Sequence, residues 1–260
     1  MPAVPFFTRV GATFEPNDPC RGPWDRESLH GRVIAGMIAH EIETTYGDPA
    51  FQYSRLTVDM FRVAPYAPVH VTSALVRDGN RIKVADATIW SGETAIGRGS
   101  VLMLRRAEQP EGEVWSRPGW NAPSADSFPP EERRAEGWEP AWETRRVPMD
   151  PSSPTPKRVW IREARGFIDG VPLTPFVRCA LVSDFTSPFA IGGTKGLNHV
   201  NADATLYLHR DLVGEWIGVE VVYQEGAEGI ANGLCVLHDA GGAIGTSTVC
   251  AVANRRKGNW

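Results

Sequence analysis

The sequence predicts an α+β protein built from two tandem copies of one unit, each a helix followed by an antiparallel sheet. Two motifs recur at one offset of 148 residues (205 − 57 and 243 − 95) in a chain of 260. Thr57–Arg62 (TVDMFR) matches Thr205–Arg210 (TLYLHR), and Ala95–Gly97 (AIG) matches Ala243–Gly245. Solenoid repeats span only about 20–50 residues, so this longer period indicates a duplicated domain.

The first unit begins with a predicted helix over residues 29–42, with Ser28 as its N-cap and Gly47 as its stop. Its apolar residues keep helical spacing: Val33, Ile34, Met37, Ile38 and Ile42. Four strands are expected next, at residues 55–63, 69–77, 81–91 and 94–105, with a hairpin turn at Asp78-Gly79-Asn80.

The second unit repeats this order. Thr174 is the expected N-cap, and Pro175 occupies the first position of a helix that continues to Phe185. Strands are expected at residues 204–210, 216–224, 229–238 and 243–253, and one more, at 160–168, precedes the helix.

Residues 107–156 connect the units and contain ten of the 21 prolines and four of the nine tryptophans. We therefore divide the chain into an N-terminal unit (1–106), a Pro/Trp-rich connecting strap (107–156) and a C-terminal unit (157–260). Because each tryptophan ring can bury about 150–250 Å², we expect an ordered strap across the sheet. A short helix is expected at residues 131–136.

The composition limits the function classes. The net charge is −4 and no basic stripe is present, so we expect no nucleic-acid partner. No apolar run approaches the roughly 20 residues that a membrane span needs, and the first residues do not resemble a secretory signal. The four cysteines lack metal-ligand or redox spacing. We expect a cytoplasmic protein with reduced thiols and no metal or other cofactor.

Several segments carry a resemblance to a known family. They are His30-Gly31, Arg55–Arg62, Gly97–Arg105, Ala180–Asp184, Asn201–Arg210, Glu215-Trp216, Asp239–Gly242 and Ser247–Cys250. In this order and spacing they resemble the acyl-CoA thioesterase superfamily, in particular its bacterial thioesterase II-like branch. That branch implies a double hotdog fold, in which a sheet wraps two helices. It also implies an acyl-CoA substrate and a homodimer.

The resemblance also implies a site. The family hydrolyses thioesters with an Asp on the second helix, a Thr before the strand that ends in His-Arg, and a Gln on the last strand. These positions hold Asp184, Asn201 and Cys250 in this sequence, so only the Asp is retained. We expect His209 and Arg210 to brace the strand end.

Each candidate catalytic residue also has a structural interpretation. Asp184 could position the attacking water, or cap the last helical turn through nearby backbone amides. Asn201 could donate to a developing oxyanion, or stabilise a turn. Cys250 could be a nucleophile, but no basic neighbour lowers its pKa, and a small buried side chain is the simpler interpretation.

His30, Gly31 and Gly36 are the candidate substrate-binding residues. The unpaired amides of the first helical turn could hold a thioester oxygen or a phosphate, or simply start the helix. Gly36 matches Asp184 in the repeat (184 − 148), which implies at most one carboxylate site per chain. Candidate cations for the CoA phosphates, or plain surface charges, are Arg77, Arg81, Arg98, Arg105, Arg106, Arg255, Arg256 and Lys257.

The leading function is hydrolysis of an acyl-CoA thioester. Asp184 would position the water, and Asn201 and the first-turn amides would polarise the carbonyl. The two helices would enclose a tunnel for an acyl or aryl group. Loss of the family Thr and Gln favours an alternative, a catalytically silent acyl-CoA or acyl-carrier binding protein. A hotdog hydratase or dehydratase is the third possibility, but Asp18-Pro19 stands apart from His30 without that chemistry's motif.

Overall fold

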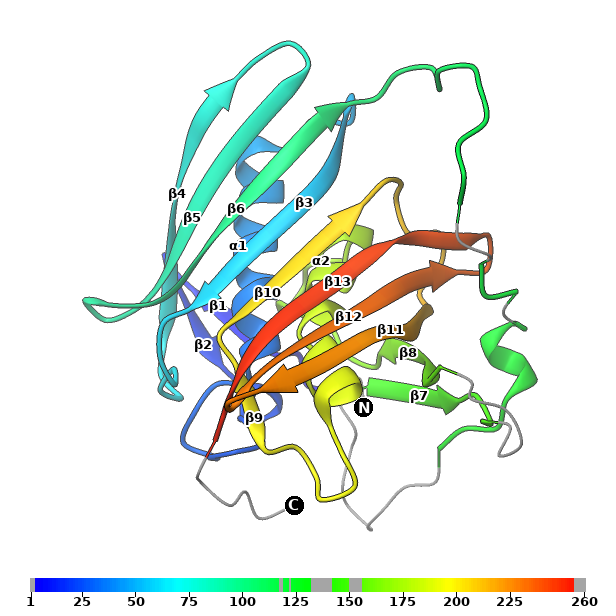
Figure 1. Ribbon diagram of the computed structural model, residues 1–260. Helices are drawn as coiled ribbons and strands as arrows, with labels where there is room; N and C mark the ends of the chain where they lie inside the picture. The colour runs from blue at the N-terminus through cyan, green and yellow to red at the C-terminus, as the bar shows by residue number, and fades with distance from the viewer. Residues whose placement is uncertain (1–2, 117–118, 122, 132–141, 150–155, 255–260) are drawn as a thin grey trace.

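One large antiparallel sheet organises the molecule (Figure 1). The computed structural model describes residues 3–116, 119–121, 123–131, 142–149 and 156–254. Within these residues the sheet has thirteen strands, twelve of them in the order β1-β2-β4-β5-β6-β3-β10-β13-β12-β11-β8-β7, with β9 paired to β13. The four-strand blocks β4-β5-β6-β3 and β11-β12-β13-β10 are the two predicted repeats, joined at β3 and β10.

The observed strands agree closely with those predicted from the alternation of apolar and polar residues. In the first repeat they are β3 Phe51–Met60, β4 Val69–Asp78, β5 Ile82–Ser91 and β6 Thr94–Arg105. In the second they are β10 Asp203–Leu208, β11 Ile217–Ala227, β12 Ile230–Asp239 and β13 Gly242–Ala253. The remaining strands are β1 Phe7–Val10, β2 Thr13–Pro16, β7 Trp142–Arg146, β8 Arg158–Glu163 and β9 His199–Asn201.

A pseudo-twofold axis passes through the centre of the sheet. Thr57 of β3 pairs with Thr205 of β10, so the two residues that head the sequence repeat face each other. The pairing register repeats with them: Met60 pairs with Gly97 as Leu208 pairs with Gly245. The predicted double hotdog α+β fold is confirmed.

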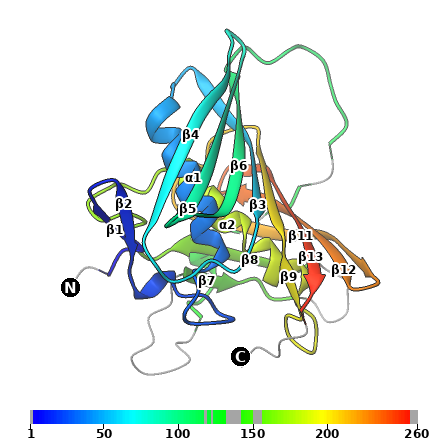
Figure 2. The same ribbon diagram turned by 90° about the vertical axis from the view of Figure 1, so that its left-hand side faces the viewer.

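Two antiparallel helices, α1 (Gly31–Tyr46) and α2 (Pro175–Ser183), lie on the concave face of the sheet, which curves around them (Figure 2). Gly31 lies against Asp184 at one end of the pair, and the Thr174 hydroxyl donates to Glu43 at the other, at 2.5 Å. Gly97 and Gly99 of β6 let α1 approach closely, because added Cβ atoms there would meet Ile34 and Ile38 at about 3 Å.

The helix ends partly correct the sequence prediction. Thr174 does cap α2, its hydroxyl accepting from the Val177 amide at 3.2 Å. The N-cap of α1, however, is His30 and not Ser28. The Ser28 hydroxyl instead donates to the Asp25 carbonyl at 2.6 Å, in the turn before the helix. Short helical turns occupy Asp18–Cys20, Ala125–Ser127 and Ser187–Ile191, the last a π-helix directly after α2.

The strap's tryptophans behave differently from one another. Trp120 is buried and its ring centroid lies 5.5 Å from that of Trp160, whose indole donates to the Pro123 carbonyl at 3.0 Å. Trp142 packs against the core from β7. Trp115 is 83% exposed, so the expectation that these rings are all buried is wrong for this one. Trp138 and most of the helix expected at 131–136 fall outside the described residues, and the domain boundaries remain a prediction.

Among the described residues, no helix is long and apolar enough to cross a bilayer.

Candidate functional site

A buried carboxylate lies where α2 ends. Asp184 is the C-cap of α2 and is only 5% exposed. The Asn201 amide donates to its Oδ1 at 2.8 Å, and the Nδ1 atom of His30 lies 3.4 Å from its Oδ2. The structure therefore brings together three of the residues singled out from sequence, from α1, α2 and β9.

Gly31 makes this approach possible. A Cβ atom at residue 31 would lie 3.0 and 3.2 Å from the two carboxylate oxygens of Asp184, and 3.2 Å from the sulfur of Met60. Real Cβ contacts are rarely that short, so any larger residue would push the carboxylate away. Gly31 thus sets the fit between the two helices at this end.

Asp184 is held in its charged form. Burial disfavours the charge, but the His30 ring, through its hydrogen bond and charge, the Asn201 amide and the nearby Arg32 outweigh that cost and lower the pKa of Asp184 below its ordinary value. An ionised, nearly dry carboxylate is a strong hydrogen-bond acceptor for whatever group faces it.

His30 receives two competing contacts at the same nitrogen. Its Nδ1 lies 3.3 Å from the Arg32 backbone N–H and 3.4 Å from Oδ2 of Asp184. The first contact requires a lone pair on Nδ1 and the second a proton. A charged carboxylate is the stronger partner, so we assign the proton to Nδ1. The His30 side chain is 28% exposed against 7% for that of Asp184, so the ring is the solvent-facing member of the cluster.

The side-chain amide of Asn201 forms hydrogen bonds within the protein. Its Nδ2 donates to Asp184 at 2.8 Å and to the Asp203 carbonyl at 3.2 Å. An amide nitrogen carries two hydrogens, so these contacts use both. The expected donation from Asn201 to an oxyanion is therefore not available in this arrangement, and the residue fixes Asp184 instead.

Cys250 does not join the cluster. It is exposed on β13 between buried Val249 and Ala251, so its side chain points to the outer face of the sheet. It is not the buried side chain that the sequence favoured. Partial burial and the neighbouring Asp203 raise its pKa, which opposes formation of a thiolate.

Gly36 lies in the interface between α1 and its neighbours. A Cβ atom there would meet Leu181 at 2.7 Å and Phe167 at 2.9 Å. The helices pack so closely that a hollow near α2 measures only about 10 Å³; it is lined by His40, Phe167, Ile168, Val171, Pro172, Leu173 and Val177. That is at or below the space one water needs, so no acyl tunnel runs through this hollow. The assignment of Gly36 to substrate binding stays a prediction.

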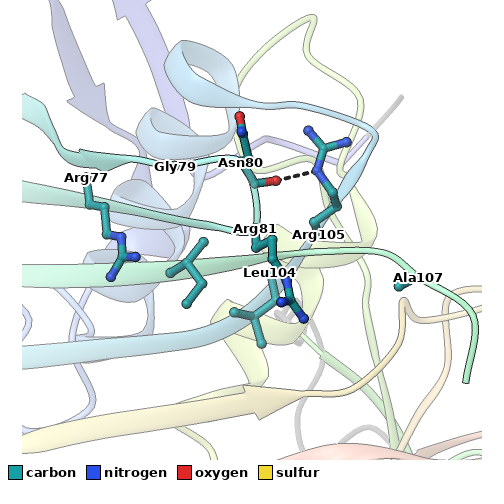
Figure 3. Close-up of a pocket in the computed structure, with 8 residues that line it drawn as sticks. Arg77, Gly79, Asn80, Arg81, Leu104, Arg105 and Ala107 are labelled. Carbon is teal, nitrogen blue, oxygen red and sulfur yellow. Dashed lines mark hydrogen bonds between the residues drawn. The ribbon is translucent and has the colours of Figure 1, made fainter. Parts of the chain in front are cut away.

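Three of the candidate cations lie far from Asp184. Arg77, Arg81 and Arg105 line an open hollow of about 610 Å³ at the β4–β5 hairpin (Figure 3). Arg105 pairs with Phe51 at one end of β3, whereas Met60 at the other end borders Asp184 through Gly31. Nine residues at roughly 3.3 Å each separate the two places by about 30 Å.

Two of the other candidate cations form ion pairs at the surface. Arg98 is exposed and pairs with Asp59 at 2.8 Å. Arg106 pairs with Asp211 at 2.7 Å. Arg255, Arg256 and Lys257 lie outside the described residues. Arg210 does brace its strand end, through a bidentate contact with Asp239 at 2.5 and 2.7 Å.

Sequence reasoning missed a buried ion pair beside the cluster. Arg32 donates to Glu163 at 3.0 Å, with both side chains 1% exposed, and its guanidinium lies 3.8 Å from the Trp142 ring centroid. Burial raises the pKa of Glu163 to about 7, against the opposing effect of Arg32. The sequence does contain a signal for this pair, because Arg32 directly follows His30-Gly31 and lies on the apolar side of an amphipathic helix. A charged residue at such a position needs a partner of opposite charge.

Two further expectations concern hydratase chemistry and metal binding. Asp18 is exposed and contacts Arg21 and Arg26, so it forms no pair with His30 of the kind a hydratase would need. Within the described part of the chain, no group of three or more His, Cys, Asp or Glu residues is placed to hold a metal ion.

Comparison with known proteins places this geometry in a family. The acyl-CoA thioesterase N-terminal domain matches residues 20–104, and the acyl-CoA thioesterase C-terminal domain matches residues 106–250. No curated protein matches the chain significantly.

Solved structures share the whole fold. A protein described as a thioesterase from Novosphingobium aromaticivorans superposes with a TM-score of 0.73 at 19% identity, over 98% of this chain and 100% of that one. An acyl-CoA thioesterase II from Mycobacterium marinum gives 0.66 at 16% identity, over 97% of each. The tesB protein of Mycobacterium avium subsp. paratuberculosis gives 0.65 at 15%, over 95% of each. With both domain matches together spanning most of its length, the chain belongs to the acyl-CoA thioesterase family.

Proposed function

We propose that this chain hydrolyses an acyl-CoA thioester to a free acid and CoA at the cluster of His30, Asp184 and Asn201. The observation that carries the proposal is the buried, ionised Asp184, held between an amide donor and a partly exposed imidazole. A base oriented by a second group that is itself held in place is the arrangement that activates a weak nucleophile.

The chain of contacts suggests how water is activated. Asn201 fixes Asp184, Asp184 fixes the His30 ring, and His30 faces solvent. His30 in its neutral form takes a proton from water as the water oxygen bonds to the thioester carbonyl carbon. The tetrahedral intermediate then collapses, the carbon–sulfur bond breaks, and the proton passes from His30 to the departing thiolate. Asp184 stays ionised throughout and stabilises the charged ring.

The carbonyl oxygen needs a donor other than Asn201. The first turn of α1 supplies backbone amides and the positive end of a 16-residue helix beside Asp184. We assign polarisation of the thioester carbonyl to these amides.

A specific observation favours a second candidate, a binding protein without turnover. Both Asn201 donors are occupied, and Cys250 points away from the cluster, so neither reproduces the catalytic role that the family resemblance implies at its position. Such a protein would bind acyl-CoA and leave the thioester intact.

The test is thiol release from short, long and aromatic acyl-CoAs by wild-type protein and His30→Gln. Turnover that falls on the order of 100-fold or more in the variant supports the His30 mechanism. Turnover retained in His30→Gln contradicts the base role of His30 and transfers it to Asp184. Tight binding of an acyl-CoA by the wild type without thiol release establishes the binding protein instead, and no binding to any member of the panel rejects both.

A further inference from the structure

One buried guanidinium serves two buried carboxylates. Arg32 lies in the first turn of α1, and its side chain is 1% exposed. Its Nη1 donates to Oε1 of Glu163 on β8 at 3.0 Å, and its charge also acts on Asp184 at the end of α2. The two acids therefore share one cation, and the division of its charge between them bears on the candidate site.

The contact between Arg32 and Glu163 is a single one. Within the described part of the chain, Nε and Nη2 of Arg32 and Oε2 of Glu163 are buried and have no hydrogen-bond partner. A guanidinium and a carboxylate can form two parallel hydrogen bonds, and a buried pair that leaves its other polar atoms unsatisfied adds little to stability. Glu163 therefore compensates the charge of Arg32 only in part.

Two aromatic rings hold the guanidinium in place. Its central carbon lies 3.8 Å from the ring centroid of Trp142 on β7 and 4.5 Å from that of Phe6. Both contacts have the geometry in which a cation is attracted to a ring face. Because the rings and the helix keep water away from Arg32, its charge is weakly screened and acts on neighbouring groups more strongly than a surface charge would.

The backbone places Arg32 beside the candidate base. Its N–H lies 3.3 Å from Nδ1 of His30, and that nitrogen lies 3.4 Å from Oδ2 of Asp184. His30 is therefore next to one negative group, Asp184, and in the same helical turn as one positive group, Arg32.

The charge of Asp184 alone would work against a base at His30. A carboxylate beside an imidazole favours the protonated ring, and a protonated ring cannot take a proton from water. A cation close to both groups has the opposite effect. Burial raises the pKa of Glu163 to about 7, so Glu163 is largely uncharged below neutral pH and leaves the charge of Arg32 to Asp184 and His30.

Other ionisable groups around the pair are fewer or already engaged. Arg165 and Arg178 act on Glu163 from the segment after β8 and from α2, and Arg178 donates to Glu215 at 2.6 Å. Cys20 faces Arg32 from the turn before α1, and burial raises the pKa of its thiol, which keeps it neutral. Arg32 is itself one of the groups that lower the pKa of Asp184, which links it directly to the site.

We propose that Arg32 is a positioning residue for this reaction: its buried guanidinium offsets the charge of Asp184, so that His30 stays neutral and able to accept a proton near pH 7. Glu163 tunes the effect, because each increment of its negative charge takes up part of the charge of Arg32. The inference rests on the proposed hydrolysis at His30 and Asp184 and deepens it.

The pH profile of kcat/KM tests this role. In Arg32→Met, the acid-side midpoint should rise by roughly one pH unit, and in Glu163→Gln it should fall by roughly half a unit. Arg32→Lys keeps the charge and should stay near the wild-type midpoint. NMR titration of the His30 ring without substrate should show the same shifts.

A double variant separates this role from a purely structural one. Arg32→Met/Glu163→Gln leaves no charge unpaired in the interior, so it should fold even where Arg32→Met does not, and circular dichroism checks this. Its midpoint should still rise by roughly one unit, because the charge of Arg32 is gone. Arg210→Met/Asp239→Asn is the matched control. It removes a pair whose carboxylate is fully buried, next to the end of β10 remote from Asn201, and should leave the midpoint unchanged.

Three results would overturn the role of Arg32: a wild-type midpoint in the double variant, shifts of the same sign in Arg32→Met and Glu163→Gln, or a shift in the Arg210 control as large as that in Arg32→Met. The NMR titration needs no turnover. Shifted NMR midpoints in a chain that releases no thiol would therefore reject the proposed hydrolysis alone, whereas an unshifted His30 midpoint in a chain that does release thiol would reject the role of Arg32 alone.

Discussion

The two repeats share a backbone register but carry different chemistry. Their central strands pair through Thr57 and Thr205, and their β-bulges recur at the same place, between Ile89 and Trp90 and between Leu237 and His238. Yet α1 has 16 residues and ends at the C-cap Gly47, whereas α2 has nine and has the carboxylate of Asp184 as its C-cap. The comparison shows that pairing register constrains both halves, whereas the helices and their ends are free to specialise.

Moving the carboxylate into the first repeat should produce the largest effect. In Gly36→Asp, the new side chain would meet Leu181 and Phe167 at less than 3 Å, in an apolar interface with no donor provided for it. We expect the free energy of unfolding to fall by about 4 kcal/mol or more, measured by urea denaturation. Gly193→Ala, where nothing lies within 4 Å, should change it by less than about 0.5 kcal/mol. Equal losses in the two variants would contradict the close helix contact.

The two buried acids near Arg32 should respond to pH in opposite directions. Glu163 has a pKa near 7 when folded and an ordinary value of 4.5, so its contribution to stability is complete below about pH 4.5 and is lost as pH rises through 7. The pKa of Asp184 is lowered, so its contribution is present above about pH 4 and is lost in acid.

In the wild type, the free energy of unfolding should therefore fall by up to about 3 kcal/mol between pH 5 and 8. Glu163→Gln has no ionisable group at this position, so this fall should be absent in the variant. Urea titrations across this range measure the slope for both proteins. An unchanged slope in the variant would assign the pH dependence to other groups.

Gly31→Ala sharpens the comparison at the junction of the two helices. The added Cβ would lie 3.0 Å from the Asp184 carboxylate and displace it from His30 and Asn201. We expect kcat/KM for thioester hydrolysis to fall about 10- to 100-fold, because small displacements of reacting groups are costly. Gly166→Ala is the control, since its nearest neighbour would be 3.8 Å away. Wild-type activity in Gly31→Ala would show that the close approach is not required.

The smallest effect is expected on the outer face of the sheet. The Cys250 thiol is exposed and its pKa is raised, so Cys250→Ser should leave kcat/KM within about twofold of the wild type. A loss above tenfold would return Cys250 to the catalytic machinery.

Sequence reasoning predicted the sheet well and the helix ends poorly, for physical reasons. Alternating burial and hairpin turns are local signals, and β6 was predicted with its observed bounds, Thr94–Arg105. The N-cap of α1 was placed at Ser28 because serine is a strong capping residue, but Ser28 is held by the Asp25 carbonyl in the preceding turn. Competing local hydrogen bonds of this kind cannot be read from residue type alone.

The site was predicted as a set of residues and not as a set of contacts. Asp184, Asn201 and His30 were selected, but the role given to Asn201 assumed a free amide, and Asp203 claims that donor through its backbone. The 148-residue offset also does not match equivalent positions within the two helices. It matches Gly36 to Asp184, although Gly36 is in the middle of α1 and Asp184 ends α2. The helices differ in length, 16 residues in α1 and nine in α2, and strand periodicity does not encode that difference.

The most direct measurement is thiol release from acyl-CoA by Asp184→Asn. The amide keeps the shape of the side chain and removes the charge that orients His30, so we predict a loss of kcat on the order of 1,000-fold with binding of a non-hydrolysable acyl-CoA thioether retained. Asp59→Asn, an exposed carboxylate at the same end of the sheet, serves as the control. Hydrolysis at the wild-type rate by Asp184→Asn would contradict the assignment of this carboxylate as the centre of the site.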